Sequence, residues 1–171
     1  FDYWEPLQVL DGYDAVEVVA HQGWVQHGEV GMTGLSYPGI SQLFVAAARP
    51  PHLAAITPMS VIADTTTSTL APGGIFNEGF AFAWAERVLD GARPYGKGWE
   101  MDVVEVERAM VGRSICEDNQ LLHSQAVDAI EKAQANPYYS DALAGPLDPT
   151  TFVNQIDVPV FLSGQWQDEQ T

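Results

Sequence analysis

The segment from residue 28 to 49 constrains the fold of this chain more than any other part of it. An apolar run, VGMTGL, passes through Ser36 into Tyr-Pro-Gly and then into residues with helical spacing. The run predicts a short buried strand over 28–35, and the pattern after it predicts a helix over 36–49. A second apolar run predicts a strand over 52–61. Strand, helix and strand in this order predict a parallel α/β unit.

The serine at the apex of this turn suggests a catalytic role. A serine hydroxyl is a weak nucleophile and must be held where a base can take its proton. A tight turn between a strand and a helix exposes such a hydroxyl at the carboxyl edge of the sheet, beside the N–H groups of the first helical turn. Ser36 is therefore the candidate nucleophile, and the backbone N–H of Tyr37 is the candidate oxyanion donor. The alternative is that Ser36 only caps the helix.

The residues around Ser36 fit a sharp turn. Gly34 leaves room for it, Pro38 suits the first turn of a helix, and Gly39 allows the helix to pack closely on neighbouring strands. The motif Gly-x-Ser-x-Gly is not met, because Pro38 occupies its last position and the glycine arrives at 39. The motif alone is thus weak, and its position between strand and helix carries the interpretation.

The rest of the chain is organised around this unit. An apolar stripe predicts a helix over 11–22, and helical signals extend from about residue 75 to 135. A strand-like run returns at 156–164. A helical insertion between two strands of one sheet fits a cap over an active site, and ordinary crossover helices are the alternative. About sixty residues is long for one crossover.

These patterns predict three regions. Residues 1–70 are expected to form a parallel α/β core with the serine turn, residues 71–150 a helical cap, and residues 151–171 a return to the core. The start lacks an initiator methionine and opens within a pattern, and the end, QDEQT, comes just after a strand-like run; together they suggest a fragment with both ends missing.

Composition narrows the partners. Acidic residues outnumber basic ones 23 to 7, for a formal charge of −16. Nothing is then available to neutralise phosphates, so nucleic acid is not an expected partner, and an anionic membrane surface would repel the chain. The charge serves solubility or an acidic interaction surface. The single cysteine allows no internal disulfide; it is compatible with the cytoplasm and does not decide the compartment. No metal-ligand motif or cofactor is indicated.

Four separated stretches resemble one family. The sequence is similar to the cocaine esterase and Xaa-Pro dipeptidyl-peptidase group of α/β-hydrolases. The similarity lies in a Gly-x-Ser-Tyr-x-Gly turn, an upstream Asp-Gly-Tyr-Asp, a Gly-Gly-x-Phe segment and a Gly-x-Trp-x-Asp strand end; these are residues 34–39, 11–14, 73–76 and 164–168.

The resemblance implies a Ser, Asp, His triad in that chain order. Asp168 would be the acid that orients the histidine, with Asp64 as the alternative. His21, His27, His52 and His123 all precede Asp168, so the catalytic histidine is expected after Thr171. A second oxyanion donor, a tyrosine hydroxyl, is expected upstream of Phe1.

Several aromatic residues are candidates for a substrate pocket. Phe76, Phe80, Phe82 and Trp84 would line an acyl pocket, or would simply form the buried face of a helix. Trp166, two residues before the proposed acid, is open to the same two interpretations.

The sequence thus predicts a serine hydrolase that cleaves an ester or amide through an acyl-enzyme. The first hypothesis is an acyl esterase acting on a small-molecule ester, and the second is an Xaa-Pro dipeptidyl-peptidase acting on peptides. A third, of a different class, is a non-catalytic truncated fragment or binding module. The 171 residues alone are expected to be inactive because they lack the base. Oligomeric state is not readable.

Overall fold

The computed structural model describes residues 4–91, 103, 105–106, 108–110 and 128–168. They belong to two compact units. One unit contains the described residues up to Phe76 and from Tyr138 onward, and the other contains the described residues between Asn77 and Pro137.

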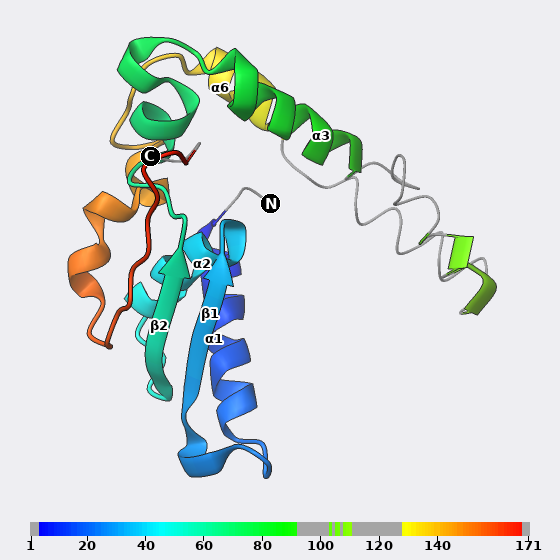
Figure 1. Ribbon diagram of the computed structural model, residues 1–171, viewed down its shortest axis with the longest axis vertical. Helices are drawn as coiled ribbons and strands as arrows, with labels where there is room; N and C mark the ends of the chain where they lie inside the picture. Colours follow the sequence, from blue (N-terminus) through cyan, green and yellow to red (C-terminus); the bar gives the residue numbers. More distant parts are fainter. Residues whose placement is uncertain (1–3, 92–102, 104, 107, 111–127, 169–171) are drawn as a thin grey trace. The chain divides into compact units, whose positions relative to one another are not determined.

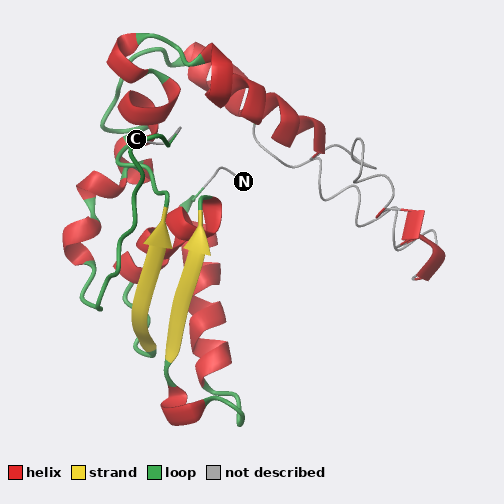
Figure 2. Ribbon diagram, viewed as in Figure 1, coloured by secondary structure: helices red, strands yellow, loops and turns green. Residues whose placement is uncertain are grey.

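The first unit is built on two parallel strands (Figure 2). Strand β1 (Val30–Leu35) pairs with β2 (Leu53–Met59), and the register runs from Gly31 opposite Ala55 to Leu35 opposite Met59. The chain between them forms helix α2 (Tyr37–Ala47). The predicted parallel α/β unit is confirmed, with each element slightly shorter than its sequence pattern indicated.

Helix α1 (Pro6–Ala20) precedes β1 and lies with α2 on one face of the sheet (Figure 1). It begins five residues earlier than the predicted helix over 11–22. The reason is Pro6, whose fixed φ suits a first helical turn and which follows Glu5 in an extended conformation. The helix turns Val16 and Ala20 toward the core.

The core lies between the two helices and the sheet. Its central cluster combines residues of α1, α2 and β2, namely Val16, Leu43, Val45, Ala46, Leu53 and Ile56. A second cluster continues it through Ile40, Phe44 and Ile62. The buried side of α2 therefore fixes this helix on the sheet immediately after Ser36.

A third parallel segment runs beside β2. Val160 bridges to Ile56 and Ser163 bridges to Met59, both in parallel orientation. The run predicted as a strand over 156–164 thus joins the sheet in the expected direction, but through isolated bridges and not as a continuous strand. The side chains of Phe161 and Leu162 are exposed.

The second unit is helical where it is described. A π-helical turn at Glu78–Phe82 leads directly into α3 (Ala83–Gly91), and α6 (Ala129–Ala135) contacts α3. Asp128 caps α6 by accepting hydrogen bonds from the N–H groups of Ile130 and Glu131 at 3.1 and 2.9 Å. Much of the predicted helical stretch over 75–135 lies outside the described residues. The boundaries 1–70, 71–150 and 151–171 stay a prediction. Among the described helices, none combines the length and the apolar character needed to cross a membrane.

Candidate active site

Ser36 occupies the single residue between β1 and α2, and its backbone is strained. Its φ of 62° and ψ of −126° lie in a region that L-residues other than glycine rarely adopt. Such a conformation costs about 1–3 kcal/mol and persists only when its surroundings impose it. Here the Ser36 N–H donates to Met59 O at 3.0 Å, and Ser36 O accepts from the N–H groups of Gly39 and Ile40, both at 2.8 Å.

Two glycines make this turn possible. A Cβ on Gly34 would stand 2.6 Å from the Pro38 Cβ, and a Cβ on Gly39 would stand 2.5 Å from Met59 O. Real Cβ atoms essentially never come so close to other heavy atoms. The predicted roles of Gly34 in the turn and of Gly39 in helix packing are confirmed.

The side chain of Ser36 does not cap α2, although the residue stands at the N-cap position. Tyr37 is the first residue of the helix, so its N–H belongs to the turn whose donors point out of the helix start. The ring of Tyr37 stacks on Trp4 at a centroid distance of 5.2 Å. Ser36 and the start of α2 therefore lie together at the end of β1.

The three parallel segments end side by side. On the far side of β2, Ser163 N–H donates to Pro58 O at 3.1 Å and Ser60 N–H donates to Ser163 O at 3.0 Å. The carboxyl ends of β1, β2 and the third segment thus form one edge (Figure 1). Ser36 lies at this edge, and the half-buried Asp168 follows Ser163 by five residues.

Asp64, the alternative acid, has a local role. It stands before a π-helical turn at Thr65–Leu70, and its carboxylate accepts hydrogen bonds from the N–H and the hydroxyl of Thr67. This carboxylate is the cap of the turn.

A buried aspartate, Asp148, binds the same π-helical turn at its first residue, Thr65. Asp148 is fully buried, and its Oδ1 accepts the Thr65 N–H at 2.7 Å. Burial raises the pKa of the Asp148 carboxyl; the Thr65 hydrogen bond opposes the shift, and the charge of Asp64 adds to it. Burial and the charge of Asp148 likewise raise the pKa of Tyr139. Asp148 holds the chain that leaves the carboxyl end of β2.

The described histidines lie at the other end of the sheet. His27 precedes β1, His52 directly precedes β2, and His21 follows α1. Since β1 spans 6 residues at about 3.3 Å each, roughly 20 Å separates this end from Ser36. None of these three can reach the Ser36 hydroxyl. His123 lies outside the described residues.

The aromatic candidates are divided between the two units. Phe76 and Trp166 belong to the unit of the sheet, with Phe76 half-buried and Trp166 fully exposed. Phe80 and Trp84 belong to the helical unit, in the π-helical turn and in α3. A shared substrate pocket stays a prediction.

The sequence pattern does not reveal one cluster of potential metal ligands that the structure brings together. Glu17, His21 and His52 are the one group of metal-ligating side chains found within the described part of the chain. Its only sequence signal is the spacing of four between Glu17 and His21, which places both on one face of a helix. His52 joins them through the fold.

The architecture is that of part of an α/β-hydrolase. Two solved structures of a CocE/NonD family hydrolase from Staphylococcus aureus share this fold, with TM-scores of 0.65 and 0.66 and 23% sequence identity each. They match 92% and 93% of this chain, which spans only 22% and 23% of theirs. A search of curated proteins finds no match.

The family model for the X-Pro dipeptidyl-peptidase (S15 family) matches residues 1–171. The chain belongs to this family of serine hydrolases.

Proposed function

We propose that Ser36 is the nucleophile of a serine hydrolase that cleaves an acyl ester or amide. One observation carries the proposal: a serine, not a glycine, is held at φ 62° and ψ −126° at the carboxyl end of a parallel strand, with its side chain not used as a cap. A turn that only reversed the chain would have no use for this strain. Family membership supports the same interpretation.

The proposed chemistry proceeds through an acyl-enzyme. The Ser36 Oγ attacks the substrate carbonyl carbon while a histidine takes the hydroxyl proton. The carbonyl oxygen becomes an oxyanion, which the Tyr37 N–H stabilises at the start of α2. The histidine then protonates the leaving alcohol or amine, and water hydrolyses the acyl-serine by the reverse sequence.

Asp168 is the proposed acid that orients this histidine. Its support is that the three parallel segments end at one edge of the sheet. Ser36 lies at this edge, and the chain that leads to Asp168 leaves the sheet there. Asp64 is the weaker candidate because Thr67 already occupies its carboxylate. The histidine itself is proposed to follow Thr171 in the full-length protein, and the second oxyanion donor to precede Phe1.

The helical unit is proposed to serve as the cap of the hydrolase. Its support is its place in the chain, inserted between β2 and the third parallel segment. Phe76, Phe80, Trp84 and Trp166 are proposed to line the acyl pocket.

Two substrate classes follow. The first is a small acyl ester, because an uncharged acyl group would require only the proposed apolar pocket and no charged binding group. The second is a peptide with an Xaa-Pro amino terminus, which the family match favours. The full-length protein, assayed with p-nitrophenyl esters and with an Xaa-Pro-p-nitroanilide, decides between them.

The nucleophile is tested by covalent labelling. A fluorophosphonate probe added to the full-length protein should modify Ser36, and Ser36→Ala should abolish labelling. Ser41→Ala is the matched control, since Ser41 lies in the same helix and bonds only to Pro38 O in its own turn. Modification of another serine, or none in a folded protein, would reject Ser36 and leave the non-catalytic alternative.

The acid is tested by a pair of substitutions. Asp168→Asn should lower kcat by roughly 10⁴-fold, the loss known for a triad aspartate in a serine protease. Asp64→Asn should change kcat far less. If Asp64→Asn has the larger effect while both variants stay folded, the acid belongs to the chain after β2.

A further inference from the structure

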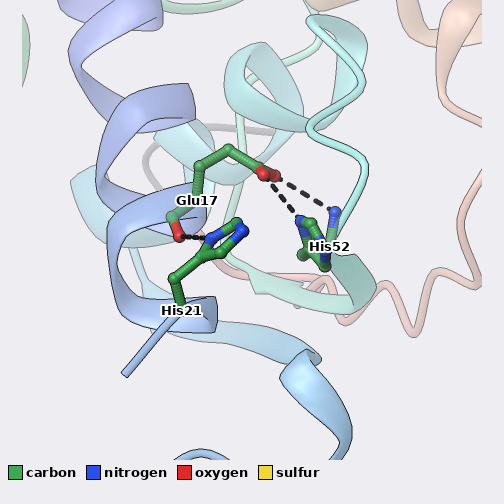
Figure 3. A group of neighbouring side chains, drawn as sticks. All are labelled: Glu17, His21 and His52. Carbon is green, nitrogen blue, oxygen red and sulfur yellow. Dashed lines mark hydrogen bonds and ion pairs between the residues drawn. The ribbon is translucent and has the colours of Figure 1, made fainter. Parts of the chain in front are cut away.

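A second cluster of ionisable side chains lies at the amino ends of the strands, at the opposite end of the sheet from Ser36. Glu17 and His21 stand one turn apart at the end of α1, and His52 stands in the residue before β2 (Figure 3). The rings of His21 and His52 meet edge to face, with centroids 4.9 Å apart and planes at 74°. The carboxylate of Glu17 lies between the helix and His52.

The contacts of the cluster fix how each group is presented. Nδ1 of His21 lies 2.7 Å from the main-chain O of Glu17. Because a carbonyl oxygen only accepts, this bond requires the proton on Nδ1 and leaves the lone pair of a neutral ring on Nε2. Metal-binding histidines in proteins are commonly oriented by this kind of outer bond to a carbonyl.

Glu17 and His52 are joined by two contacts. The main-chain N–H of His52 donates to Glu17 Oε1 at 3.1 Å, and the ring Nδ1 lies 2.6 Å from Oε2. Burial of the carboxylate opposes its ionisation, but the ring and main-chain N–H of His52 lower the pKa of Glu17 below its ordinary value of 4.5. Glu17 is therefore a carboxylate at neutral pH, held against His52 by both contacts.

We propose that Glu17, His21 and His52 form a binding site for a divalent transition-metal ion of the Zn²⁺ class. Imidazole nitrogens and carboxylate oxygens are ligands that Zn²⁺ favours. The ligand atoms of all three residues lie within 4.8 Å of one another. Ligands about 2.0–2.2 Å from one ion lie at most about 4.4 Å apart, so small side-chain rotations close the site.

Binding would place the ion between the carboxylate and the two rings. Glu17 Oε2 and His52 Nδ1 would hold it, with the single proton of the neutral His52 ring on Nε2 so that Nδ1 offers a lone pair, and His21 Nε2 would supply the third ligand. Water completes the coordination. The site is open to solvent, since the side chains of His52 and Glu17 are 39% and 20% exposed and His21 is exposed.

The role of this ion is structural. It would join the end of α1 to the loop before β2, a connection now made by the Glu17–His52 contacts and the His21–His52 ring contact. Because the cluster lies at the opposite strand ends from Ser36, about 20 Å away, the ion takes no part in acyl transfer. The proposal is therefore independent of the proposed hydrolase activity.

The test is Zn²⁺ titration of the metal-free full-length protein by calorimetry, with thermal unfolding followed in parallel. His21→Gln is the decisive variant, because it removes one ligand and leaves the Glu17–His52 contacts in place. We expect it to weaken Zn²⁺ binding by about 10- to 100-fold, at least the loss that removing an outer-shell partner causes. His27→Asn is the matched control; it removes an exposed histidine with a positive φ outside the cluster, and asparagine tolerates that conformation.

A second readout reports coordination directly. Co²⁺ bound by histidine and carboxylate in place of Zn²⁺ should give visible absorption bands in the parent and His27→Asn proteins, and these should be lost in His21→Gln. Equal Zn²⁺ affinity in His21→Gln and His27→Asn, or no saturable binding by the parent protein, would overturn the proposal. Either result would leave Glu17 and His52 as a salt bridge that only fastens α1.

Discussion

At the scale of the residue, the strained backbone lies at Ser36, the proposed nucleophile. Its positive φ is imposed from both sides, by the Met59 carbonyl on the sheet and by the first turn of α2. Gly34 and Gly39 supply the space, and no larger residue fits at either position. The fold therefore maintains an unfavourable backbone at one residue, and the packing of its neighbours offsets the cost.

Ser36→Gly should be more stable than Ser36→Ala by about 1 kcal/mol, because glycine adopts a φ of 62° without steric penalty. Both variants lack the hydroxyl, so the difference reports the backbone alone. Urea unfolding with equal m values measures it. Equal stability of the two variants would mean that the turn is not strained.

The pH dependence of stability should carry a contribution from Asp148. Its pKa is raised by burial, so the fold favours the protonated form. The stability that protonated Asp148 contributes to the fold is fully present below pH 3.8, the ordinary pKa of an aspartate. It is lost as the pH rises through the raised pKa of Asp148 in the folded protein.

Asp148→Asn cannot ionise and keeps an oxygen for the Thr65 N–H. The Tm of this variant relative to the parent should therefore rise between pH 4 and pH 8. Asp148→Ala removes the acceptor and should be destabilised by about 1–3 kcal/mol across that range. If the difference in Tm between Asp148→Asn and the parent does not change with pH, the pKa of Asp148 is not raised in the folded protein.

At the scale of the element, the sheet and α2 act as one support for the turn. Gln42 is completely buried; its Nε2 donates to Pro38 O at 2.8 Å and its Oε1 accepts the Thr57 N–H at 3.0 Å. This side chain connects the first turn of α2 to the middle of β2. The first turn of α2, which follows Ser36 directly, is thus tied to β2 by Gln42.

Gln42→Leu should destabilise the protein by about 1–3 kcal/mol, because it leaves the Thr57 N–H buried without its acceptor. If the turn is the active site, kcat should fall as well. Ser41→Ala, one residue away on a less buried position, should stay within about 0.5 kcal/mol of the parent. Denaturant unfolding of the three proteins measures the differences.

The elements differ in how well the sequence predicts them. β1, α2 and β2 were predictable because apolar runs and helical spacing follow one another without a break. The start of α1 lies ahead of the apolar stripe that predicts the helix, because Pro6 begins the first turn. The run over 156–164 has the sequence pattern of a strand, but it joins β2 through two isolated bridges and not as a continuous strand.

The candidate sites show the same contrast. The serine turn is local, so its strand, glycines and helix start are all visible within a dozen residues. The Glu17, His21 and His52 cluster depends on α1 returning its end to the start of β2, and no pattern in the sequence encodes that meeting. Asp148 was likewise missed, because its burial arises from packing against the chain after β2.

At the scale of the whole molecule, the chain is a sheet unit interrupted by a helical unit. It spans about 22% of the length of the solved hydrolases that share its fold. Ser36 and Asp168 are present, but the described histidines lie at the wrong end of the sheet, and none follows Asp168 in the sequence.

The 171 residues alone should therefore show no Ser36-dependent turnover of p-nitrophenyl acetate. Without imidazole the serine stays a neutral hydroxyl near pH 7, and water or tyrosine does not replace the base. The measurement compares the chain with its Ser36→Ala variant. A rate that depends on Ser36 and approaches that of ordinary esterases would point to His123 as the base.

The bridge between Ile56 and Val160 has a consequence for synthesis on the ribosome. β1, α2 and β2 are complete about a hundred residues before their third neighbour is made. At 5–20 residues per second, roughly 5–20 s pass with the outer edge of β2 unpaired. An open strand edge invites association with other nascent chains. Pro58 lies on that edge, and because proline has no N–H, the waiting strand offers one donor fewer to a wrong partner.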